Sequence, residues 1–293
     1  MRGIVLAGGS GTRLWPITKG VNKHLLHVYD KPMIHYPIGT LMAAGIREIL
    51  VIVNEFDLPT FKRLLGSGAK YGVEFSYEVQ CSPNGIAEAF IIGEAFINNE
   101  TSALILGDNI FHGSGLGRQL MDFTKPIGAH IFAYQVRNPS DYGVVEFDSN
   151  GNAVSIQEKP INPKSNYAVP GLYFYDKNVC EIAKSIVPSK RGELEISEIN
   201  AEYLRRGNLK VSVLPRGTAW LDTGNADSLH DASSYIKIIE ERQGAKVSCL
   251  EEIAWRQKWI GDVELQASAM EFKNSAYGDS LLKLIDLGIG LDD

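Results

Sequence analysis

Short apolar runs alternate with amphipathic segments through the first 110 residues of the chain. Four of these runs predict strands, at residues 4–7, 49–53, 73–79 and 103–106. The segments between them predict helices, over residues 32–45, around 61–66 and over 86–96. In the first helix, Pro32 suits the first position and Gly45 the C-terminal cap. Strands and helices in this order indicate right-handed βαβ units and a mostly parallel sheet.

The pattern after residue 140 is typical of antiparallel structure. Residues 143–147 and 153–157 flank a polar turn that contains glycine, and they predict a hairpin. A strand follows over residues 167–175, where Pro170 limits pairing, and then a helix and a strand at 196–204 and 209–214. Beyond residue 224 the pattern is helical, over residues 229–239, 253–259 and 281–285. The chain is therefore predicted to have an α/β fold, with a Rossmann-like, mostly parallel sheet flanked by helices, an antiparallel subdomain and a C-terminal helical appendage.

Composition excludes several classes of protein. The 293 residues are 44% hydrophobic with a formal net charge of −6, which fits a globular protein and argues against a nucleic-acid partner. No apolar stretch is long enough to cross a membrane. The first predicted strand begins within a few residues of Met1, which leaves no room for a signal peptide. Three scattered cysteines without a Cys-x-x-Cys pair fit a cytoplasmic protein.

The glycine-rich segment after the first predicted strand suggests phosphate binding. Its glycines let backbone N–H groups face an anion, and Arg13 adds donors suited to phosphate oxygens. A dinucleotide fingerprint is excluded because Leu14 stands where a third glycine is needed. A P-loop is excluded because no Gly-Lys-Ser/Thr closes the turn. The segment is thus predicted to be a phosphate loop of another kind.

Two carboxylates come directly after predicted strands. Asp108 follows the run at 103–106, and Asp222 follows the apolar pair at 220–221. Ligands bind at the carboxyl ends of strands in open α/β sheets, so both aspartates are expected near the glycine loop, in an arrangement suited to Mg²⁺ and nucleotide phosphates. Each aspartate also has a structural alternative, as a turn or helix-cap residue. Cations such as Lys23 and Arg191, and the pair Glu158–Lys159, could likewise be solvated surface charges.

Several segments together resemble the sugar-phosphate nucleotidyltransferase family. They are residues 8–18 with Lys23 beyond, and residues 30–34, 107–111, 158–160, 191–196 and 219–224. Each segment alone is weak evidence for the family, but the occurrence of all of them in this order along the chain is specific to it. In particular, they resemble the members that join dTTP to glucose 1-phosphate, and the resemblance extends from residue 1 to about residue 277.

The resemblance implies attack by the phosphate of glucose 1-phosphate on the α-phosphorus of dTTP, which gives dTDP-glucose and pyrophosphate and feeds deoxysugar synthesis. It implies a nucleotidyltransferase domain at residues 1–240, with a nucleotide-binding part at about 1–110 and a sugar-phosphate-binding part at about 111–240. Residues 241–293 would form a helical appendage for oligomer or regulatory contacts. The expected assembly is a homotetramer, and the expected cofactor is Mg²⁺ held by Asp108 and Asp222.

The resemblance also assigns site residues to three roles. Catalysis is assigned to Arg13, Lys23, Asp108, Lys159 and Asp222. Nucleotide binding is assigned to Gly8, Gly9, Gly11, Thr12, Arg13, Gln80 and Gly85, with the last two reading the thymine edge. Sugar-phosphate binding is assigned to Tyr142, Gly143, Glu158, Lys159, Val169 and Arg191.

The sequence differs from the family pattern beside the expected nucleotide. His24 follows Lys23 where glutamine is common, and Glu88 also stands where glutamine is typical. If Glu88 is buried near phosphates, we expect it to pair with a cation or a hydroxyl. Three alternatives remain open: another sugar 1-phosphate, UTP in place of dTTP, and a catalytically inactive regulator that binds nucleotide sugars.

Overall fold

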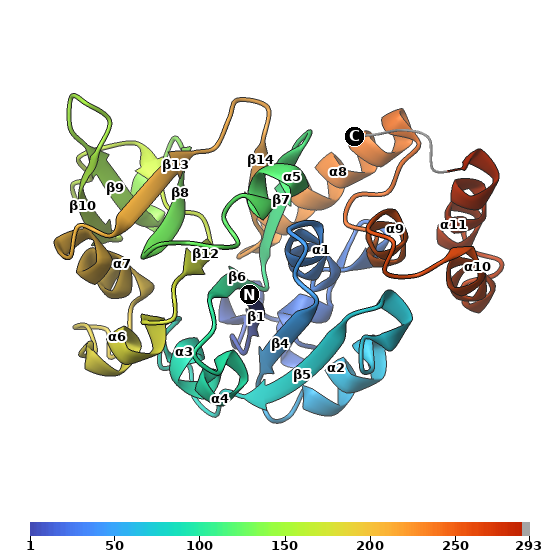
Figure 1. Cartoon of the computed structure of the whole chain (residues 1–293), viewed down its shortest axis with the longest axis horizontal. Helices are drawn as coiled ribbons and strands as arrows, with labels where there is room; N and C mark the ends of the chain where they lie inside the picture. The colour runs from blue at the N-terminus through green and yellow to red at the C-terminus, as the bar shows by residue number, and fades with distance from the viewer. Residues whose placement is uncertain (289–293) are drawn as a thin grey trace.

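A ten-stranded mixed sheet crosses the molecule in this computed structural model, which describes residues 1–288 (Figure 1). Its parallel strands lie side by side in the order β5 (Glu74–Val79), β4 (Glu48–Val53), β1 (Arg2–Ala7) and β6 (Ser102–Leu106). They confirm the four strands predicted in this half of the chain. In β1, Ile4 and Val5 are both fully buried but belong to different apolar clusters, because successive side chains point to opposite faces of the sheet.

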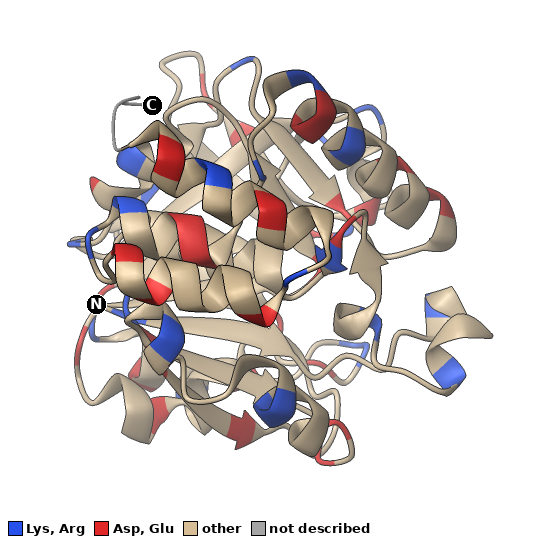
Figure 2. Ribbon diagram, turned by 90° about the vertical axis from the view of Figure 1, so that its right-hand side faces the viewer, with Lys and Arg blue, Asp and Glu red and all other residues tan. Residues whose placement is uncertain are grey.

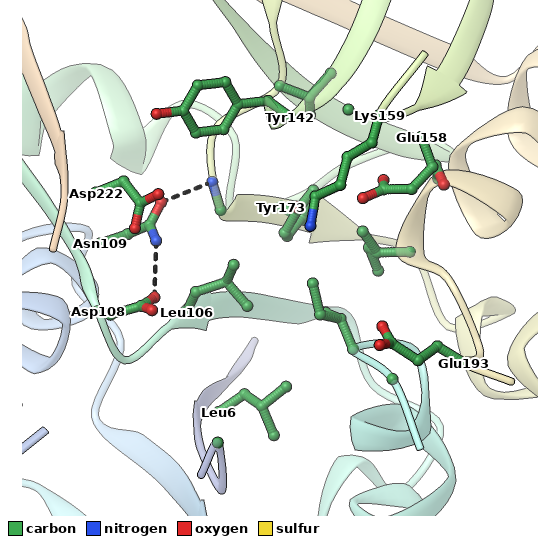
Figure 3. A pocket seen from close by; sticks show the side chains of 18 of the residues that line it. Leu6, Leu106, Asp108, Asn109, Tyr142, Glu158, Lys159, Tyr173, Glu193 and Asp222 are labelled. Carbon is green, nitrogen blue, oxygen red and sulfur yellow. Dashed lines mark hydrogen bonds between the residues drawn. The ribbon is translucent and has the colours of Figure 1, made fainter. Parts of the chain in front are cut away.

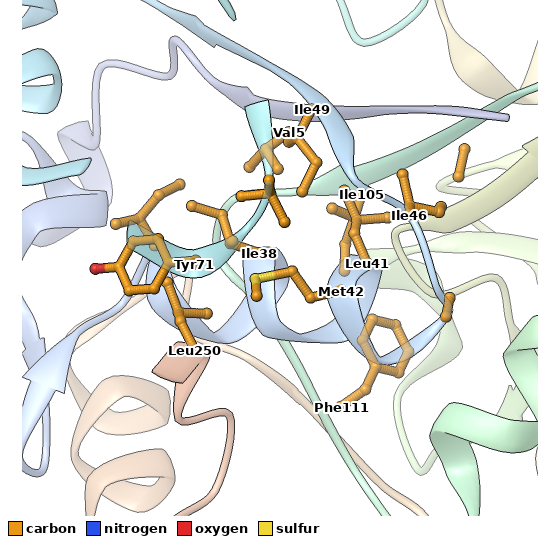
Figure 4. Close-up of a cluster of buried hydrophobic side chains, with 14 of the residues drawn as sticks. Val5, Ile38, Leu41, Met42, Ile46, Ile49, Tyr71, Ile105, Phe111 and Leu250 are labelled. Carbon is orange, nitrogen blue, oxygen red and sulfur yellow. The ribbon is translucent and has the colours of Figure 1, made fainter. Parts of the chain in front are cut away.

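Helices cover both faces of the sheet. The cluster that contains Val5 packs against α1 (His35–Ala43), α2 (Leu58–Leu65) and α5 (Leu116–Met121), and part of it is shown in Figure 4. The cluster that contains Ile4 packs against α3 (Glu88–Ile92), α4 (Glu94–Ile97), α6 (Val179–Ser185) and α7 (Ile196–Arg205). The single helix predicted over residues 86–96 is thus two short helices. They divide at Gly93, where an added Cβ would lie 3.1 Å from Leu50 and 3.2 Å from Ile4.

The second half of the sheet is antiparallel, as predicted, apart from its last strand. There β12 (Leu172–Tyr175) pairs with β6 on one side and β8 (Ala129–Gln135) on the other. The predicted hairpin is β9 (Gly143–Phe147) and β10 (Ala153–Glu158), and the predicted strand β13 (Leu209–Val213) pairs parallel with β8. The central strand β8 was not predicted, although Ile131 and its two following neighbours form a short apolar run.

The strand predicted over residues 167–175 is broken into β11 (Tyr167–Ala168) and β12. Ala168 pairs with Tyr134 and Tyr173 pairs with Ile131, so five steps along this segment match three along β8. The extra residues form a bulge at 169–171. The bulge needs Gly171, because a Cβ there would lie 2.6 Å from the Leu106 side chain.

Two short ladders lie outside the main sheet. One pairs β7 (Asn109–His112) with β14 (Ala219–Asp222), and the other pairs β2 (His27–Val28) with β3 (Lys31–Pro32). The predicted helix start at Pro32 is therefore wrong, since α1 begins at His35. Lys31 explains the extended backbone: its buried Nζ lies 3.0 Å from Glu240 Oε1, an ion pair that ties the β3 strand to α8. Gly45, at φ +82°, ends α1 by donating to the Met42 carbonyl.

The C-terminal part is helical as far as the structure describes it. Its helices are α8 (Ala226–Gln243), α9 (Leu250–Arg256), α10 (Asp262–Glu271) and α11 (Ala276–Leu287). Short 3₁₀ turns complete the chain: η1 (Thr12–Leu14), η2 (Ile17–Lys19), η3 (Lys23–Leu25), η4 (Ala69–Tyr71) and η5 (Pro139–Asp141). The end of the predicted helical segment 241–293, residues 289–293, lies outside the described residues.

The last helices share the core of the sheet domain. Leu250 and Trp255 belong to the same apolar cluster as Val5, and Figure 4 shows Leu250 beside α1. Acidic and basic residues are interspersed on the outer surfaces of the helices in Figure 2. Among residues 1–288, every helix is too short or too polar to span a bilayer.

We expect Leu250→Ala to lower the free energy of unfolding by about 2–5 kcal/mol, because it removes a fully buried side chain that joins α9 to α1. Urea denaturation followed by circular dichroism measures the change. Leu287→Ala is the matched control, since Leu287 is 79% exposed and its truncation should change stability by less than about 0.5 kcal/mol. Equal effects of the two substitutions would show that α9 does not share the core.

Candidate active site

A cavity of about 300 Å³ lies at the carboxyl ends of β1 and β6, where the parallel and antiparallel halves of the sheet meet (Figure 3). Its wall includes most of the site residues predicted from the sequence: Gly9, Arg13, Lys23, Gln80, Gly85, Asp108, Tyr142, Gly143, Glu158, Lys159, Val169 and Asp222. Gly8, Gly11, Thr12 and Arg191 lie outside this lining. The edge of an open α/β sheet at which this cavity lies is the usual ligand site of such folds.

The glycine loop brings one free cation to the cavity. Gly11 has φ +63°, and its carbonyl accepts from Leu14 N at 2.9 Å and from Thr18 Oγ1 at 2.7 Å. This turn starts η1 and carries Arg13, which is exposed and, within the described residues, forms no ion pair. Gly224 leaves room for the guanidinium, because an added Cβ would lie 2.9 Å from Arg13 Nη2 and 3.0 Å from Asp222 Oδ1. Arg13 is therefore beside Asp222 and available to an anion.

The two predicted carboxylates lie side by side. Asp222 ends β14 opposite Asn109 of β7, and Asp108 directly precedes Asn109. Figure 3 shows both carboxylates at the same end of the cavity. Asp222 is not the cap of α8, because Asn225 accepts from Ser228 N at that helix start. The placement fits the predicted pair and removes the helix-cap alternative for Asp222.

The environments of the two carboxylates move their pKa values in opposite directions. Burial, and then repulsion by Asp108, raise the pKa of Asp222 from 3.8 to about 6. Burial also acts to raise the pKa of Asp108, but an ion pair with Lys23 and a 3.0 Å hydrogen bond from Asn109 Nδ2 hold that pKa well below its usual range. Asp108 is thus fully ionised at neutral pH, whereas Asp222 carries a charge that its surroundings disfavour.

Lys23 is positioned by the short η3 turn. Asn22 caps the turn by accepting from His24 N at 2.9 Å and also lies 2.8 Å from His24 Nδ1. Burial, with the nearby Lys23 charge, lowers the pKa of His24 to about 3, so its ring is neutral. The ring packs on Gly107, where an added Cβ would lie 2.7 Å from His24 Cδ2. His24 therefore packs between the loop and β6 as a neutral side chain.

A second free cation enters from the antiparallel half. Lys159 follows β10 and has φ +41°, a backbone conformation uncommon for a residue with a side chain, and its N–H donates to the Tyr142 carbonyl at 3.0 Å. Its side chain points into the cavity in Figure 3 and makes no ion pair among residues 1–288. Beside it, burial and repulsion by Glu195 raise the pKa of Glu158.

Arg191 stays at the rim of the cavity. Its guanidinium is within 2.5 Å of Glu193, 3.4 Å of Glu195 and 3.9 Å of Glu158. Glu158 and Glu193 line the cavity, so Arg191 is one contact away from the lining. In this structure its charge is shared by these three carboxylates.

The base-reading residues predicted from the sequence have partners of their own. Gln80 Nε2 donates to Glu88 Oε2 at 2.8 Å and is 3.3 Å from the Gly85 carbonyl, and Asn84 Nδ2 donates to Glu88 Oε1 at 2.8 Å. The expected cation or hydroxyl partner of Glu88 is therefore wrong. Glu88 is half-buried, and two amide groups satisfy its carboxylate.

Sequence reasoning missed Asn109, which joins three parts of the site. Besides donating to Asp108, its Oδ1 accepts from Trp220 Nε1 at 2.7 Å and from Gly171 N at 3.0 Å. Trp220 and Tyr173 also line the cavity and were missed. Asn109 could have been found from the sequence, because it directly follows the predicted site residue Asp108. Aromatic residues within strands resemble core residues, so no sequence signal separated the other two.

The cavity offers few protein ligands for a divalent cation. Within the described part of the chain, no group of three or more His, Cys, Asp or Glu side chains converges as a complete metal site. Two carboxylates remain, which is the protein contribution usual for Mg²⁺ when phosphates and water supply the other ligands. Burial and then the neighbouring Asp108 charge raise the pKa of Asp222, and a bound cation would offset both effects. The residues therefore fit Mg²⁺.

Comparison with known proteins finds one matching family and relatives that match over nearly their whole length. The family model for nucleotidyl transferases matches residues 2–238. The chain is similar to glucose-1-phosphate thymidylyltransferase of Mycolicibacterium smegmatis, at 59% identity over 98% of this chain and 99% of that protein. It is similar to the protein of the same name from Neisseria meningitidis, at 55% identity over 97% and 99%.

Solved structures agree with these sequence relatives. A candidate glucose-1-phosphate thymidylyltransferase from Bacillus anthracis, solved with sucrose, has a TM-score of 0.74 and 40% identity, and the match covers 80% of this chain and 94% of that one. A UDP-glucose pyrophosphorylase with UDP-glucose has a TM-score of 0.70 and 27% identity over 81% and 98%. With its parallel sheet, its cavity at the strand ends and relatives matched over nearly their whole length, this chain belongs to the nucleotidyl transferase family.

Proposed function

We propose that the chain joins dTTP and α-D-glucose 1-phosphate to give dTDP-glucose and pyrophosphate. The observation that carries the proposal is the convergence in one cavity of Arg13 and Lys159, which form no ion pair within residues 1–288, with the adjacent carboxylates Asp108 and Asp222. The full-length identity to proteins named for this reaction selects the substrates.

The chemistry of the reaction accounts for the residue types. The phosphate of the sugar is already an anion near neutral pH, so its attack on the α-phosphorus needs no general base. The difficulty is to bring two anionic reactants into line and to stabilise the charge that builds on the leaving pyrophosphate. Arg13, with the N–H groups of Gly9, Gly11 and Thr12, would hold the triphosphate, while Gly8 leaves space for Gln80.

The antiparallel half would hold the sugar phosphate. Lys159 would bind its phosphate, and Arg191, which three carboxylates hold at the rim, would donate to the same phosphate. Glu158 and Tyr142, with the backbone at Gly143 and Val169, would contact sugar hydroxyls. Lys23 would neutralise the triphosphate from the opposite wall.

Asp108 and Asp222 would hold Mg²⁺, which when bound offsets negative charge on the α-phosphate and the leaving group. In this arrangement Asn109 fixes the orientation of Asp108, and the β7–β14 ladder fixes the spacing of the two aspartates. From the resemblance we also propose a cytoplasmic homotetramer whose product feeds deoxysugar synthesis. Another sugar 1-phosphate or UTP in place of dTTP, and an inactive regulator, are the alternatives.

Pyrophosphate release should require dTTP, glucose 1-phosphate and Mg²⁺ together. When nucleoside triphosphates are tested against sugar 1-phosphates, turnover should be fastest with this pair.

Asp108→Asn should lower kcat at least about 100-fold, because it removes a charge that supports the cation and pairs with Lys23. A coupled pyrophosphate assay measures both. Unchanged turnover in this variant would contradict the metal assignment, and nucleotide-sugar binding without any turnover would favour the regulator.

Lys159→Gln should raise the KM for glucose 1-phosphate about 10- to 100-fold, the usual range for losing a charged hydrogen bond to a phosphate. The KM for dTTP should change less than about threefold, since Lys159 enters from the opposite half of the cavity. Steady-state kinetics with each substrate varied in turn separates the two. Lys164→Gln is the control, because Lys164 is a 61% exposed lysine paired only with Glu146 among the described residues. Equal effects on both KM values would contradict the assignment to the sugar phosphate.

Asp222→Asn should stabilise the protein in EDTA at pH 8 while abolishing activity. Because the folded-state pKa of Asp222 is raised to about 6, its contribution to stability is complete below pH 4 and is lost as the pH rises through 6. The variant should therefore match the wild type at pH 4 and exceed its free energy of unfolding by about 3 kcal/mol at pH 8.

Thermal melts over this pH range, with and without Mg²⁺, measure the difference, and Mg²⁺ should stabilise only the wild type. Asp231→Asn, at an exposed position of α8, is the control and should show no such pH dependence. A variant that is less stable than the wild type at pH 8 would contradict the repulsion between the two aspartates.

A further inference from the structure

The amide of Gln80 has a fixed orientation at one end of the cavity. Gln80 follows β5 and is only 5% exposed. Two acceptors surround its nitrogen, Glu88 Oε2 at 2.8 Å and the Gly85 carbonyl at 3.3 Å. An amide oxygen facing these two groups would be repelled by both, so the nitrogen must occupy this side.

The oxygen of the same amide is left for a ligand. No donor among residues 1–288 contacts Gln80 Oε1, although the side chain lines the cavity. The oxygen lies over Gly8 at the start of the glycine loop, where an added Cβ would be only 2.7 Å away. Leu6, Pro83 and Ile86 add apolar side chains to the cavity lining, as a flat base requires.

Glu88 fixes the orientation of the Gln80 amide. It begins α3, and its other oxygen accepts from Asn84 Nδ2 at 2.8 Å, so the carboxylate is held from two sides. A carboxylate can only accept, whereas a glutamine at this position could either donate or accept. Glu88 therefore excludes the reversed Gln80 amide more strictly than a glutamine would.

We propose that Glu88 is a positioning residue that holds Gln80 with its carbonyl oxygen toward the base, so that the site selects bases carrying an N–H where they face Gln80. The proposal rests on the proposed function, because it takes the occupant of this end of the cavity to be the base of the nucleoside triphosphate. Thymine and uracil carry N3–H and satisfy the oxygen. Cytosine presents a lone pair at N3 and is rejected, while the thymine methyl group is not read by this contact.

The test compares kcat/KM for dTTP, dUTP and dCTP, with glucose 1-phosphate and Mg²⁺ saturating, in the wild type and two variants. The wild type should prefer dTTP and dUTP over dCTP by about 100-fold or more, as expected where a mismatched base leaves a buried polar group unpaired. Glu88→Met keeps the length of the side chain but removes its carboxylate, which leaves only the more distant Gly85 carbonyl to hold the nitrogen, so Gln80 can reverse and donate to cytosine. Its preference for dTTP over dCTP should fall at least about tenfold, with the KM for glucose 1-phosphate unchanged.

Glu88→Gln should restore the preference to within about threefold of the wild type, because its amide oxygen can still accept from Gln80 and Asn84 can reverse. Glu94→Met is the matched control: Glu94 is also in the first turn of a short helix but is exposed and pairs with Lys184 at 2.5 Å. It should leave the base preference unchanged.

An unchanged preference in Glu88→Met would overturn the proposal, and so would a wild type that uses dCTP as well as dTTP, a result that does not depend on how the variants fold. A wild type without turnover on any nucleoside triphosphate contradicts the proposed function instead. Calorimetric binding of dTTP and dCTP to the same proteins then tests Glu88 independently of catalysis.

Discussion

Repulsion between negative charges at the ends of the parallel strands is the constraint on which the site depends. Asp108 and Asp222 are brought together by a strand pair, and burial raises the cost of their charges. The reaction proposed here would add two phosphorylated reactants to the same cavity. The surrounding cations follow from this constraint, because each wall of the cavity supplies positive charge at a different point: Arg13, Lys23 and Lys159.

The parallel and antiparallel halves of the sheet each position different charged groups around the cavity. The parallel half ends in tight loops whose glycines allow backbone and side chains to approach each other closely, as at Gly8 and Gly107. The antiparallel half carries Lys159 and Glu158 on the end of a hairpin. Asn109 joins the halves, since it bonds to Asp108 on one side and to the bulge at Gly171 on the other. Groups that must act together are thus held by strand ends and their hydrogen bonds, which limits their relative movement.

Much of the fold and of the site composition could be predicted from the sequence, because periodic apolar runs and strand-end motifs are local signals. The parallel strands and the hairpin came from such runs, and Asp108 from its place after one of them. The failures have a tertiary cause. Pro32 is extended because Lys31 is buried against Glu240, more than two hundred residues away, and the strand at 167–175 breaks because Gly171 must pass close to Leu106. Asn109 was missed because a hydrogen-bonding hub is defined by its partners, and those partners are distant in sequence.

The two aspartates differ in how far nearby cations balance their negative charge. Lys23 already neutralises Asp108, and this ion pair holds the pKa of the Asp108 carboxylate well below its usual range. Asp222 has no cation at ion-pair distance among residues 1–288, and the nearby charges of Arg13 and Lys23 only partly offset its burial and the repulsion by Asp108. A cation held between the two aspartates would therefore relieve the most unfavourable charge at Asp222, and it would also weaken the attraction of Asp108 for Lys23. Lys23 would then be available to phosphate oxygens of the proposed substrates. The ion pair between Lys23 and Asp108 places a cation in the cavity lining beside Gly9, where the proposed reaction would bring a second anion.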